Sequence, residues 1–221
     1  MVLTRRDKPV IFQSPQHVAM ENLVFAAMRP HLPDLGGKRV LDLGCGWGGY
    51  GHRFAEGGSH VIFVDGRPEN LAKTEELTPG QSYVLQNVTA PWWTPPETDI
   101  ALCIGILYHV GEPLSLLAKL SKAPLVFVET MCIDHDGAAL VTLQEDTGQM
   151  DWSLDGPACR PSPGWVKESL EGFGFSVREL HVDPIEPGPS WPGARWTWDF
   201  QRTCGWRRDE SQLRKLFVAR R

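Results

Sequence analysis

The sequence has little of what secreted, membrane-spanning or disulfide-stabilised proteins require. No apolar run approaches the ~20 residues of a transmembrane helix, and the opening segment MVLTRRDKPVIFQ holds no apolar run of signal-peptide length. Five cysteines are widely scattered without C-x-x-C spacing, which argues for reduced thiols and against a zinc or redox site. These absences predict a cytoplasmic protein with no membrane partner.

A surplus of positive charge is also missing. The chain carries 22 lysines and arginines against 27 aspartates and glutamates, and its formal net charge is -5 at pH 7. Binding along a phosphate backbone depends on a dense excess of Lys and Arg, so the composition argues against a nucleic-acid partner. The basic segment from Arg195 to Arg221 is interpreted as a solvated surface. With 221 residues, 42% of them apolar, the chain is expected to form one domain, residues 1–221.

Strand-like and helix-like patterns alternate along the chain. Strands that are apolar on both faces and alternate with helices form parallel sheets covered on both sides, so we predict an α/β fold. Residues 131–163, rich in Gly, Asp and Pro, are expected to be a long excursion of the kind that covers binding sites. The predicted strands are residues 39–43, 60–65, 82–86, 100–104, 125–129, 175–182 and 212–219, and the predicted helices are residues 16–31, 50–56, 68–77, 113–120 and 164–173.

The segment VLDLGCGWGG follows the first predicted strand and precedes a helix. It places Gly44, Gly46 and Gly49 in G-x-G-x-x-G spacing, where residues without side chains let backbone N–H groups approach a ligand. This spacing fits a dinucleotide-binding dehydrogenase as well as a nucleoside-binding methyltransferase. Asp42 favours the second class, because a carboxylate at the mouth of the loop would repel a pyrophosphate and attract the ammonium group of an amino acid.

Asp65 ends the second predicted strand. At that position a carboxylate can accept hydrogen bonds from both hydroxyls of a ribose. The alternative is a helix cap before Pro68. Ribose binding supports a nucleoside ligand and does not choose between the two enzyme classes.

Three segments, VLDLGCGWGG, HVIFVD and DIALCIGILYHV, together resemble signature segments of class I (Rossmann-like) S-adenosylmethionine-dependent methyltransferases. The likeness covers residues 39–129. It implies a doubly wound, seven-stranded, mostly parallel sheet with a final antiparallel strand, residues 212–219, between the fifth and sixth strands. It also implies a first-helix region (1–38), a cofactor-binding half (39–130) and a substrate-side half with a covering insertion (131–221).

The resemblance assigns S-adenosylmethionine as the cofactor and places it at the ends of the first four strands. Asp42 is implied to bind the methionine amino group and Asp65 the ribose. Asn87 stands where many relatives have an aspartate, and it can serve the adenine amino group through its amide oxygen. The full implied set is Asp42, Gly44, Cys45, Gly46, Asp65, Gly66, Asn87, Val88 and Ile104.

Methyl transfer from a sulfonium is an in-line displacement, so the protein's task is alignment, with proton removal added where the acceptor is a hydroxyl. Tyr108 and His109 follow the fourth predicted strand on the ligand-binding edge, and His109 is the first candidate for a base or substrate-orienting group. A helix-start histidine bonded to backbone is the alternative. Glu129 ends the fifth strand and is expected to face the cleft; a loop anchor is its alternative. The catalytic candidates are therefore His109, Glu129 and Tyr108.

The same edge also offers side chains that could bind a divalent metal. His109, Glu129 and the segment 134–136 (DHD) offer mixed oxygen and nitrogen ligands. Acidic turn residues beside Gly137 explain that segment without a metal, so we predict none.

Tryptophans are concentrated towards the C-terminus. Exposed tryptophans stack on sugar faces or flat aromatic substrates, and the alternative is a loop pinned over the sheet edge. The group comprises Trp191, Trp196, Trp198 and Trp206.

Four functions follow from these patterns. The first is S-adenosylmethionine-dependent methylation of a small molecule or saccharide, with oxygen as the preferred acceptor atom. The second is tRNA-base modification with a related cofactor, because GILYHV resembles that segment in such enzymes, although the acidic balance counts against it. A non-catalytic binding subunit should lose Asp42, Asp65 or a loop glycine, and a dehydrogenase is disfavoured by Asp42. The sequence leaves a homodimer open.

Overall fold

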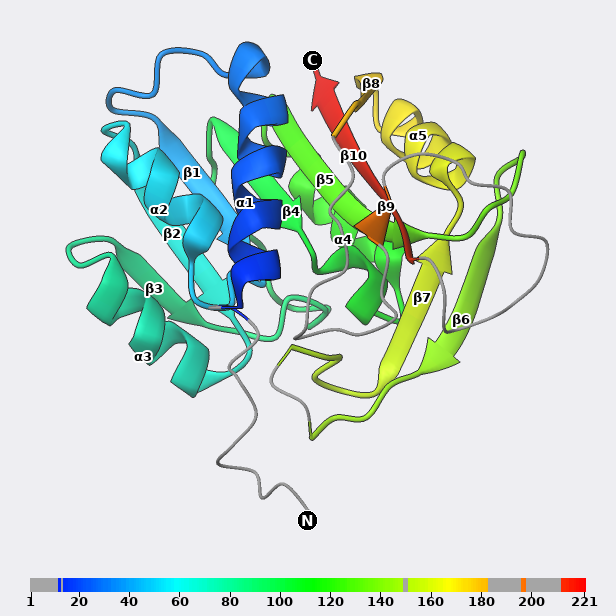
Figure 1. Cartoon of the computed structure of the whole chain (residues 1–221), viewed down its shortest axis with the longest axis horizontal. Coiled ribbons are helices and arrows are strands. Elements are labelled where there is room, and N and C mark those ends of the chain that lie inside the picture. The colour runs from blue at the N-terminus through cyan, green and yellow to red at the C-terminus, as the bar shows by residue number, and fades with distance from the viewer. Residues whose placement is uncertain (1–11, 13, 149–150, 183–195, 198–211) are drawn as a thin grey trace.

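The computed structural model describes residues 12, 14–148, 151–182, 196–197 and 212–221, and it arranges them as a sheet between two layers of helices (Figure 1). The main sheet has seven strands in the order β3-β2-β1-β4-β5-β10-β8, and the two-residue strand β9 pairs with β10. The strands are β1 (Arg39–Leu43), β2 (His60–Asp65), β3 (Ser82–Leu85), β4 (Ile100–Ile104), β5 (Leu125–Cys132), β6 (Leu140–Gln144), β7 (Pro157–Pro161), β8 (Ser176–Leu180), β9 (Trp196–Thr197) and β10 (Gln212–Arg220).

The helices begin where the sequence supplies caps and prolines. Ser14 caps α1 by accepting from the backbone N–H of His17 at 3.2 Å, and Ser162 caps α5 by accepting from Trp165 at 3.1 Å. A proline follows each cap at the first helical position, where its missing N–H costs nothing. The helices are α1 (Pro15–Met28), α2 (Gly49–Glu56), α3 (Pro68–Leu77), α4 (Pro113–Leu120) and α5 (Pro163–Gly172), with the short 3-10 helices η2 (Arg29–His31) and η3 (Leu107–His109).

The predicted strand order is confirmed. Strands β1, β2, β3, β4 and β5 pair in parallel, whereas β10 runs antiparallel to both β5 and β8 and lies between them. Leu216 of β10 stands opposite Glu129 of β5 in this register. The carboxyl ends of β1, β2, β4 and β5 therefore share one edge of the sheet.

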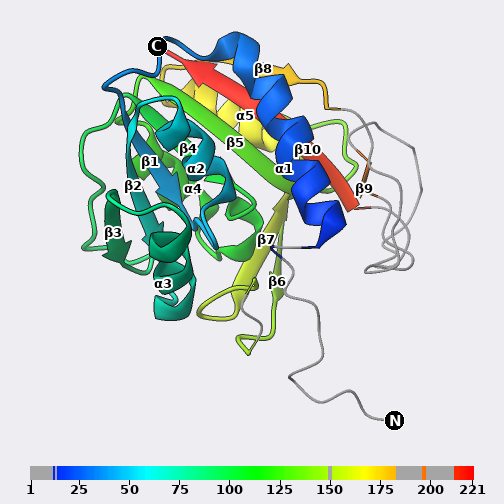
Figure 2. The same ribbon diagram turned by 60° about the vertical axis from the view of Figure 1, so that its left-hand side comes forward.

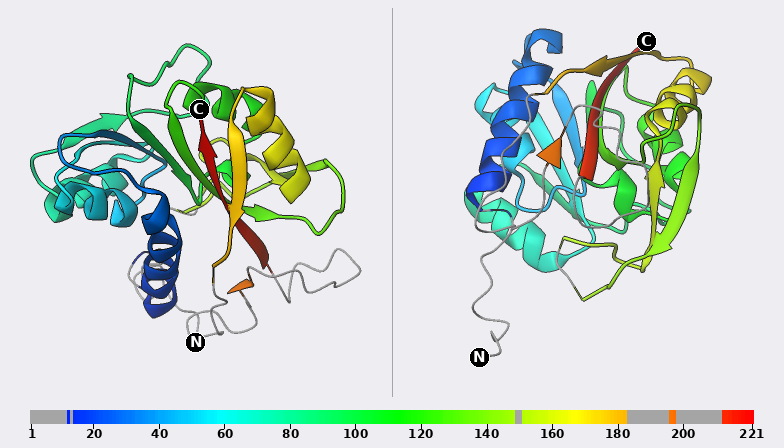
Figure 3. Two further views of the ribbon diagram at one scale, coloured as in Figure 1. Left: turned by 90° about the horizontal axis from the view of Figure 1, so that it is seen from above. Right: turned by 45° about the vertical axis from the view of Figure 1, so that its right-hand side comes forward.

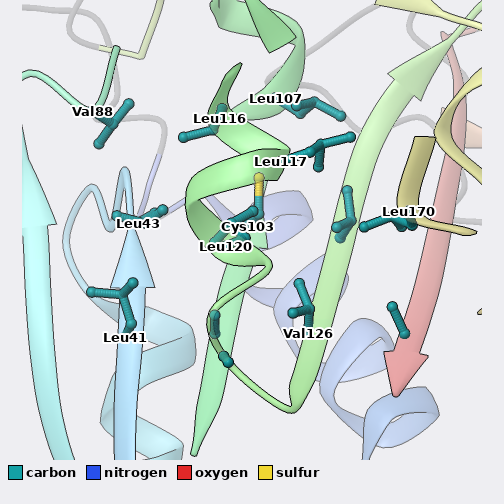
Figure 4. Packing of buried hydrophobic residues seen from close by; sticks show 14 of the residues in the cluster. Leu41, Leu43, Val88, Cys103, Leu107, Leu116, Leu117, Leu120, Val126 and Leu170 are labelled. Atoms are coloured by element: carbon teal, nitrogen blue, oxygen red, sulfur yellow. The ribbon is translucent and has the colours of Figure 1, made fainter. Parts of the chain in front are cut away.

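Each face of the sheet has its own apolar core. Helices α1, α2 and α3 cover one face with residues such as Val24 and Phe54, and α4 and α5 cover the other (Figure 3, left). Figure 4 shows the second core, where Leu116, Leu117 and Leu120 of α4 pack over Val126 of β5. The alternation of buried strands and one-sided helices in the sequence thus produces the predicted doubly wound fold.

The excursion after β5 contains structure that the sequence analysis did not predict. Strands β6 and β7 form a separate antiparallel sheet, with Gln144 opposite Pro157. Residues in β6 alternate between half-buried and exposed, the pattern of a strand with one solvated face. Figure 2 shows β6 and β7 reaching past the sheet on the side where α1 begins. We call residues 140–161 the β-hairpin below.

Several sequence-based expectations lie outside the described residues. They concern Trp191, Trp198, Trp206 and Cys204, and of Trp196 only the backbone is described. Within the described residues, no helix is long and apolar enough to cross a membrane.

Candidate active site

The glycine loop between β1 and α2 is fastened to the neighbouring strand. The N–H groups of Gly44 and Cys45 both donate to the carbonyl of Val64, at 2.8 and 3.1 Å. Gly44 has a φ of +62°, and a Cβ there would lie 2.6 Å from the side chain of Ile106. Only glycine fits this close turn, since any side chain at this position would collide with Ile106.

Asp42 is buried beneath this loop. Its carboxylate accepts from the N–H of Gly51 at 3.1 Å, at the start of α2. Burial, followed by the nearby carboxylates of Glu21 and Asp65, raises the pKa of Asp42 to about 7, against the lowering effect of the Gly51 hydrogen bond. The carboxylate is turned towards α2, and its surroundings disfavour the ionised form.

Asp65 braces the loop from β2. Its carboxylate accepts from the N–H of Gly46 at 2.9 Å, from the N–H of Arg67 at 2.9 Å and from the amide of Asn70 at 3.2 Å. Burial raises its pKa despite these three hydrogen bonds. Two oxygens with about four lone-pair positions leave room for a further donor.

Glu21 of α1 is a member of this edge that the sequence analysis missed. Its carboxylate lies against Gly49, where a Cβ would be 2.0 Å from the Glu21 Oε1. Glu21 also pairs with His17 at 3.2 Å. In the described part of the chain, no lysine or arginine forms an ion pair with Glu21, Asp42 or Asp65. The helical spacing of α1 did not distinguish Glu21 from an ordinary surface residue.

The β-hairpin contacts the loops that follow β2 and β3. Asn87 donates its amide to Asp155 at 2.6 Å, and its amide oxygen accepts from both the N–H and the hydroxyl of Thr89, at 2.9 and 2.7 Å. Leu154 lies against Gly66, where a Cβ would be 2.5 Å from Leu154 Cδ2. The amide oxygen expected to serve an adenine is therefore already engaged within the protein.

Three further residues of the implied cofactor set have mainly apolar surroundings. Val88 and Ile104 are buried in the two cores. The Cys45 thiol lies 3.7 Å from the Gly46 carbonyl oxygen, and burial raises its pKa. The side chains of Val88 and Ile104 thus offer a ligand no hydrogen-bonding group.

Glu129 and Tyr108 belong to one buried network. Arg214 binds Glu129 through two hydrogen bonds of 2.5 and 2.8 Å, and it reaches the Tyr108 hydroxyl at 3.3 Å. Glu129 has no exposed surface. Burial raises the pKa of Tyr108, although Arg214 acts in the opposite direction. We expected Glu129 to face the cleft, but Arg214, 85 positions along the sequence, covers its carboxylate.

His109 is held by a carboxylate from the β-hairpin. Its Nδ1 lies 2.5 Å from Glu145 Oε2. Glu145 also accepts from the N–H of Ser153 at 2.9 Å and from Arg160 at 3.2 Å. Burial acts to raise the pKa of Glu145, but His109, Ser153 and Arg160 outweigh it, so this pKa lies below its usual value. The alternative of a histidine bonded only to backbone does not describe this contact.

The contacts of His135, in the acidic turn after β5, are local. His135 is exposed, and its ring accepts from or donates to the backbone of Gly137. Over the described ranges, no group of three or more His, Cys, Asp or Glu side chains is arranged to hold a metal ion.

Part of the chain is similar to known methyltransferases. Residues 40–123 match a family model described as a methyltransferase domain. A ubiquinone biosynthesis O-methyltransferase from Aeromonas salmonicida is 35% identical over 90 residues, which are 38% of this chain and 38% of that protein. A tRNA U34 carboxymethyltransferase from Shewanella piezotolerans is 28% identical over 153 residues, 63% of this chain and 46% of that protein. The matches thus span less than half the length of these curated relatives.

Solved structures share the fold over nearly the whole chain. Magnesium protoporphyrin IX methyltransferase from Synechocystis PCC 6803, solved with bound S-adenosylmethionine, has a TM-score of 0.60 at 16% identity and covers 97% of this chain and 86% of its own. An S-adenosylmethionine-dependent methyltransferase from Mesorhizobium loti has a TM-score of 0.59 at 21% identity, with 89% and 97% covered. The family match and the fold confirm the resemblance to class I (Rossmann-like) S-adenosylmethionine-dependent methyltransferases.

Proposed function

We propose that this chain, with its class I methyltransferase fold, transfers the methyl group of S-adenosylmethionine to a hydroxyl oxygen of a small molecule. The observation that carries the proposal is the meeting, at one sheet edge, of buried carboxylates beside the glycine loop and of His109 just past β4. The matched O-methyltransferase relatives support oxygen as the acceptor atom.

The residues beside the glycine loop fit this cofactor. Asp42, Asp65 and Glu21 concentrate negative charge, and this repulsion contributes to raising the pKa of Asp42 to about 7. A ligand with an ammonium group and a sulfonium would relieve the repulsion, because an opposite charge nearby favours the ionised carboxylate. A pyrophosphate would increase it, which argues against a dinucleotide.

We assign roles in the cofactor site as follows. Asp42 and Glu21 attract the ammonium group, Asp65 accepts a ribose hydroxyl, and the backbone from Gly44 to Gly46 forms the floor. Asn87 joins the cofactor edge to the β-hairpin, since its amide oxygen is already bonded to Thr89. Cys45, Gly66, Val88 and Ile104 complete the lining.

The same edge supplies a proton acceptor. S-Adenosylmethionine, when bound, provides a methyl group activated by its sulfonium, so the acceptor oxygen displaces sulfur in line. His109 accepts the hydroxyl proton. Glu129 and Tyr108 take up no proton in this proposal, because Arg214 covers the carboxylate of Glu129 and burial keeps the Tyr108 phenol protonated. They hold the side chains at this sheet edge in place. In this proposal residues 39–130 carry most of the cofactor site, and the described residues of the β-hairpin cover part of it through Leu154 and Asp155.

Calorimetry with S-adenosylhomocysteine tests the cofactor assignment. Wild-type protein should bind, and Asp42→Ala should weaken binding by about a hundredfold, because truncating one partner of a buried charge pair costs ~2–5 kcal/mol. Asp34→Ala, which removes an exposed carboxylate bonded only within its own turn, is the matched control. Absence of binding by the wild-type protein would sink the proposal.

Radiolabelled methyl transfer to a panel of phenols, catechols and sugars tests the acceptor class. His109→Ala should reduce turnover by about a hundredfold or more, because a positioned general base contributes ~10²–10⁴-fold. Affinity for S-adenosylhomocysteine should stay within twofold of wild type. Unchanged turnover would remove His109 from the chemistry.

A tRNA substrate is the second candidate, because the tRNA U34 carboxymethyltransferase match covers 63% of this chain. The formal net charge of -5 weighs against it. A gel-shift titration with total tRNA at 150 mM salt separates the two functions: our proposal predicts no shift, and saturable binding would favour the tRNA substrate.

A further inference from the structure

His109 and Glu145 connect the sheet edge with the β-hairpin. The two residues are 36 positions apart in the sequence, and Nδ1 of His109 lies 2.5 Å from Oε2 of Glu145. Their side chains are only 9% and 7% exposed. A hydrogen bond sheltered from water in this way is stronger than an exposed one and fixes the ring that makes it.

Glu145 is held in place independently of His109. The N–H of Ser153 donates to the same oxygen, Oε2, at 2.9 Å, and Arg160 donates to Oε1 at 3.2 Å. Arg160 also donates to the carbonyl of Tyr108, at 3.0 Å. Arg160 of the β-hairpin thus binds both the backbone carbonyl before His109 and the carboxylate that faces the His109 ring.

The charge state of Glu145 determines where the imidazole proton lies. An ionised carboxylate only accepts hydrogen bonds, so the shared hydrogen belongs to Nδ1 of His109. Neutral imidazole carries one N–H, and Nε2 then has a free lone pair. That nitrogen is the one available to take up a proton.

We infer that Glu145 is the positioning residue for His109 and holds it in the tautomer whose Nε2 accepts the proton of the acceptor hydroxyl. The inference rests on the proposed function and deepens it. The acceptor oxygen forms its bond to the methyl carbon as the carbon–sulfur bond breaks, and the sulfur keeps the electron pair. The proton moves to Nε2, and His109 afterwards releases it to water. Glu145 stabilises the imidazolium in the interval.

Nitrogen-15 NMR of the labelled, ligand-free protein tests the tautomer directly. Two-bond proton–nitrogen correlations should place the proton of neutral His109 on Nδ1 in the wild type. Glu145→Ala should lose this preference, and Glu145→Gln should keep it, since an amide oxygen still accepts. Asp146→Ala is the matched control, because the Asp146 carboxylate accepts locally from Gly148 at 2.8 Å. A wild-type proton on Nε2, or an unchanged tautomer in Glu145→Ala, overturns the inference.

A double-mutant cycle in the methyl-transfer assay tests the role in turnover. Glu145→Ala should lower kcat by about tenfold to a hundredfold while KM and S-adenosylhomocysteine affinity stay within twofold. Glu145→Ala combined with His109→Ala should be no slower than His109→Ala alone, because the two residues act as a unit. Additive losses overturn the inference. Failure of the wild type to bind S-adenosylhomocysteine would overturn the proposed function instead, and the tautomer experiment still decides the positioning contact.

Discussion

Two groups of carboxylates at the same sheet edge differ in whether a nearby arginine balances their charge. Beside the glycine loop, Asp42 and Asp65 receive hydrogen bonds from backbone N–H groups and an asparagine, and burial raises the pKa of both. Beside β4 and β5, each carboxylate has a guanidinium: Glu129 binds Arg214, and Glu145 binds Arg160. Within the described residues, Asp42 and Asp65 form no ion pair with a lysine or arginine, although Arg67 acts to lower the pKa of Asp65, whereas Glu129 and Glu145 are each paired with an arginine.

This difference distinguishes carboxylates that can bind a charged ligand from carboxylates that hold neighbouring side chains in place. A buried charge without a partner is costly, so a protein keeps one where a ligand brings the opposite charge. A buried pair that is complete within the chain fixes the residues around it and leaves no charge for a ligand. In the proposed function Asp42 and Asp65 bind the cofactor, whereas Arg214 joins Glu129 to Tyr108 and Glu145 contacts His109.

Breaking the neutralised group should have the largest effect. Arg214→Met leaves the fully buried Glu129 without its cation, and removing one partner of a buried pair costs ~3–5 kcal/mol of unfolding free energy. Urea denaturation followed by circular dichroism measures the loss. Adding Glu129→Gln to Arg214→Met should recover part of it, because the stranded charge is then gone.

Lys73→Met, which breaks the exposed Lys73–Glu76 pair, is the control for Arg214→Met. Exposed pairs contribute about 1 kcal/mol or less. If Arg214→Met also stayed within 1 kcal/mol of wild type, Glu129 would not depend on its arginine, and the contrast between the two groups would fail.

The two groups also differ in how well the sequence predicts them. The glycine loop, Asp42 and Asp65 occupy consecutive strand ends, so local patterns predict their shared edge. Glu145 sits in a polar segment that is typical of a turn, and only the pairing of β6 with β7 brings it to His109, 36 positions away. Arg214 is 85 positions from Glu129. Such contacts are determined by long-range packing, which leaves no periodic signal in a single sequence.

The pH dependence of ligand binding tests the charge assigned to Asp42. Burial and then the neighbouring carboxylates raise the pKa of Asp42 from its usual 3.8 to about 7. An ammonium ligand prefers the ionised form, so below pH 7 a proton must leave as the ligand binds. Calorimetry should find S-adenosylhomocysteine about tenfold weaker at pH 6 than at pH 8.

The raised pKa of Asp42 also affects the stability of the ligand-free protein, which changes with pH in the direction opposite to ligand affinity. Between pH 3.8 and about 7 the folded protein holds a proton on Asp42 that the unfolded chain has lost, so this residue's contribution to stability falls as the pH rises through that window. Asp42→Asn should remove both pH dependences together. An affinity for S-adenosylhomocysteine that is flat from pH 6 to pH 8 in the wild type would contradict the charge assignment.

The smallest expected effect concerns the contact between the β-hairpin and the cofactor edge. Asp155 is exposed and accepts from the Asn87 amide at 2.6 Å and, at the longer distance of 3.4 Å, from the Thr89 hydroxyl. Asp155→Ala removes both, and the shorter hydrogen bond is worth ~0.5–1.5 kcal/mol. Affinity for S-adenosylhomocysteine should fall by about two- to tenfold, since 1.4 kcal/mol corresponds to tenfold, and Asp146→Ala should leave it unchanged. If the affinity did not fall, the part of the β-hairpin around Asp155 would act independently of the cofactor edge. A loss well above tenfold would mean that Asp155 itself contacts the ligand, and the unneutralised group would then extend across the β-hairpin.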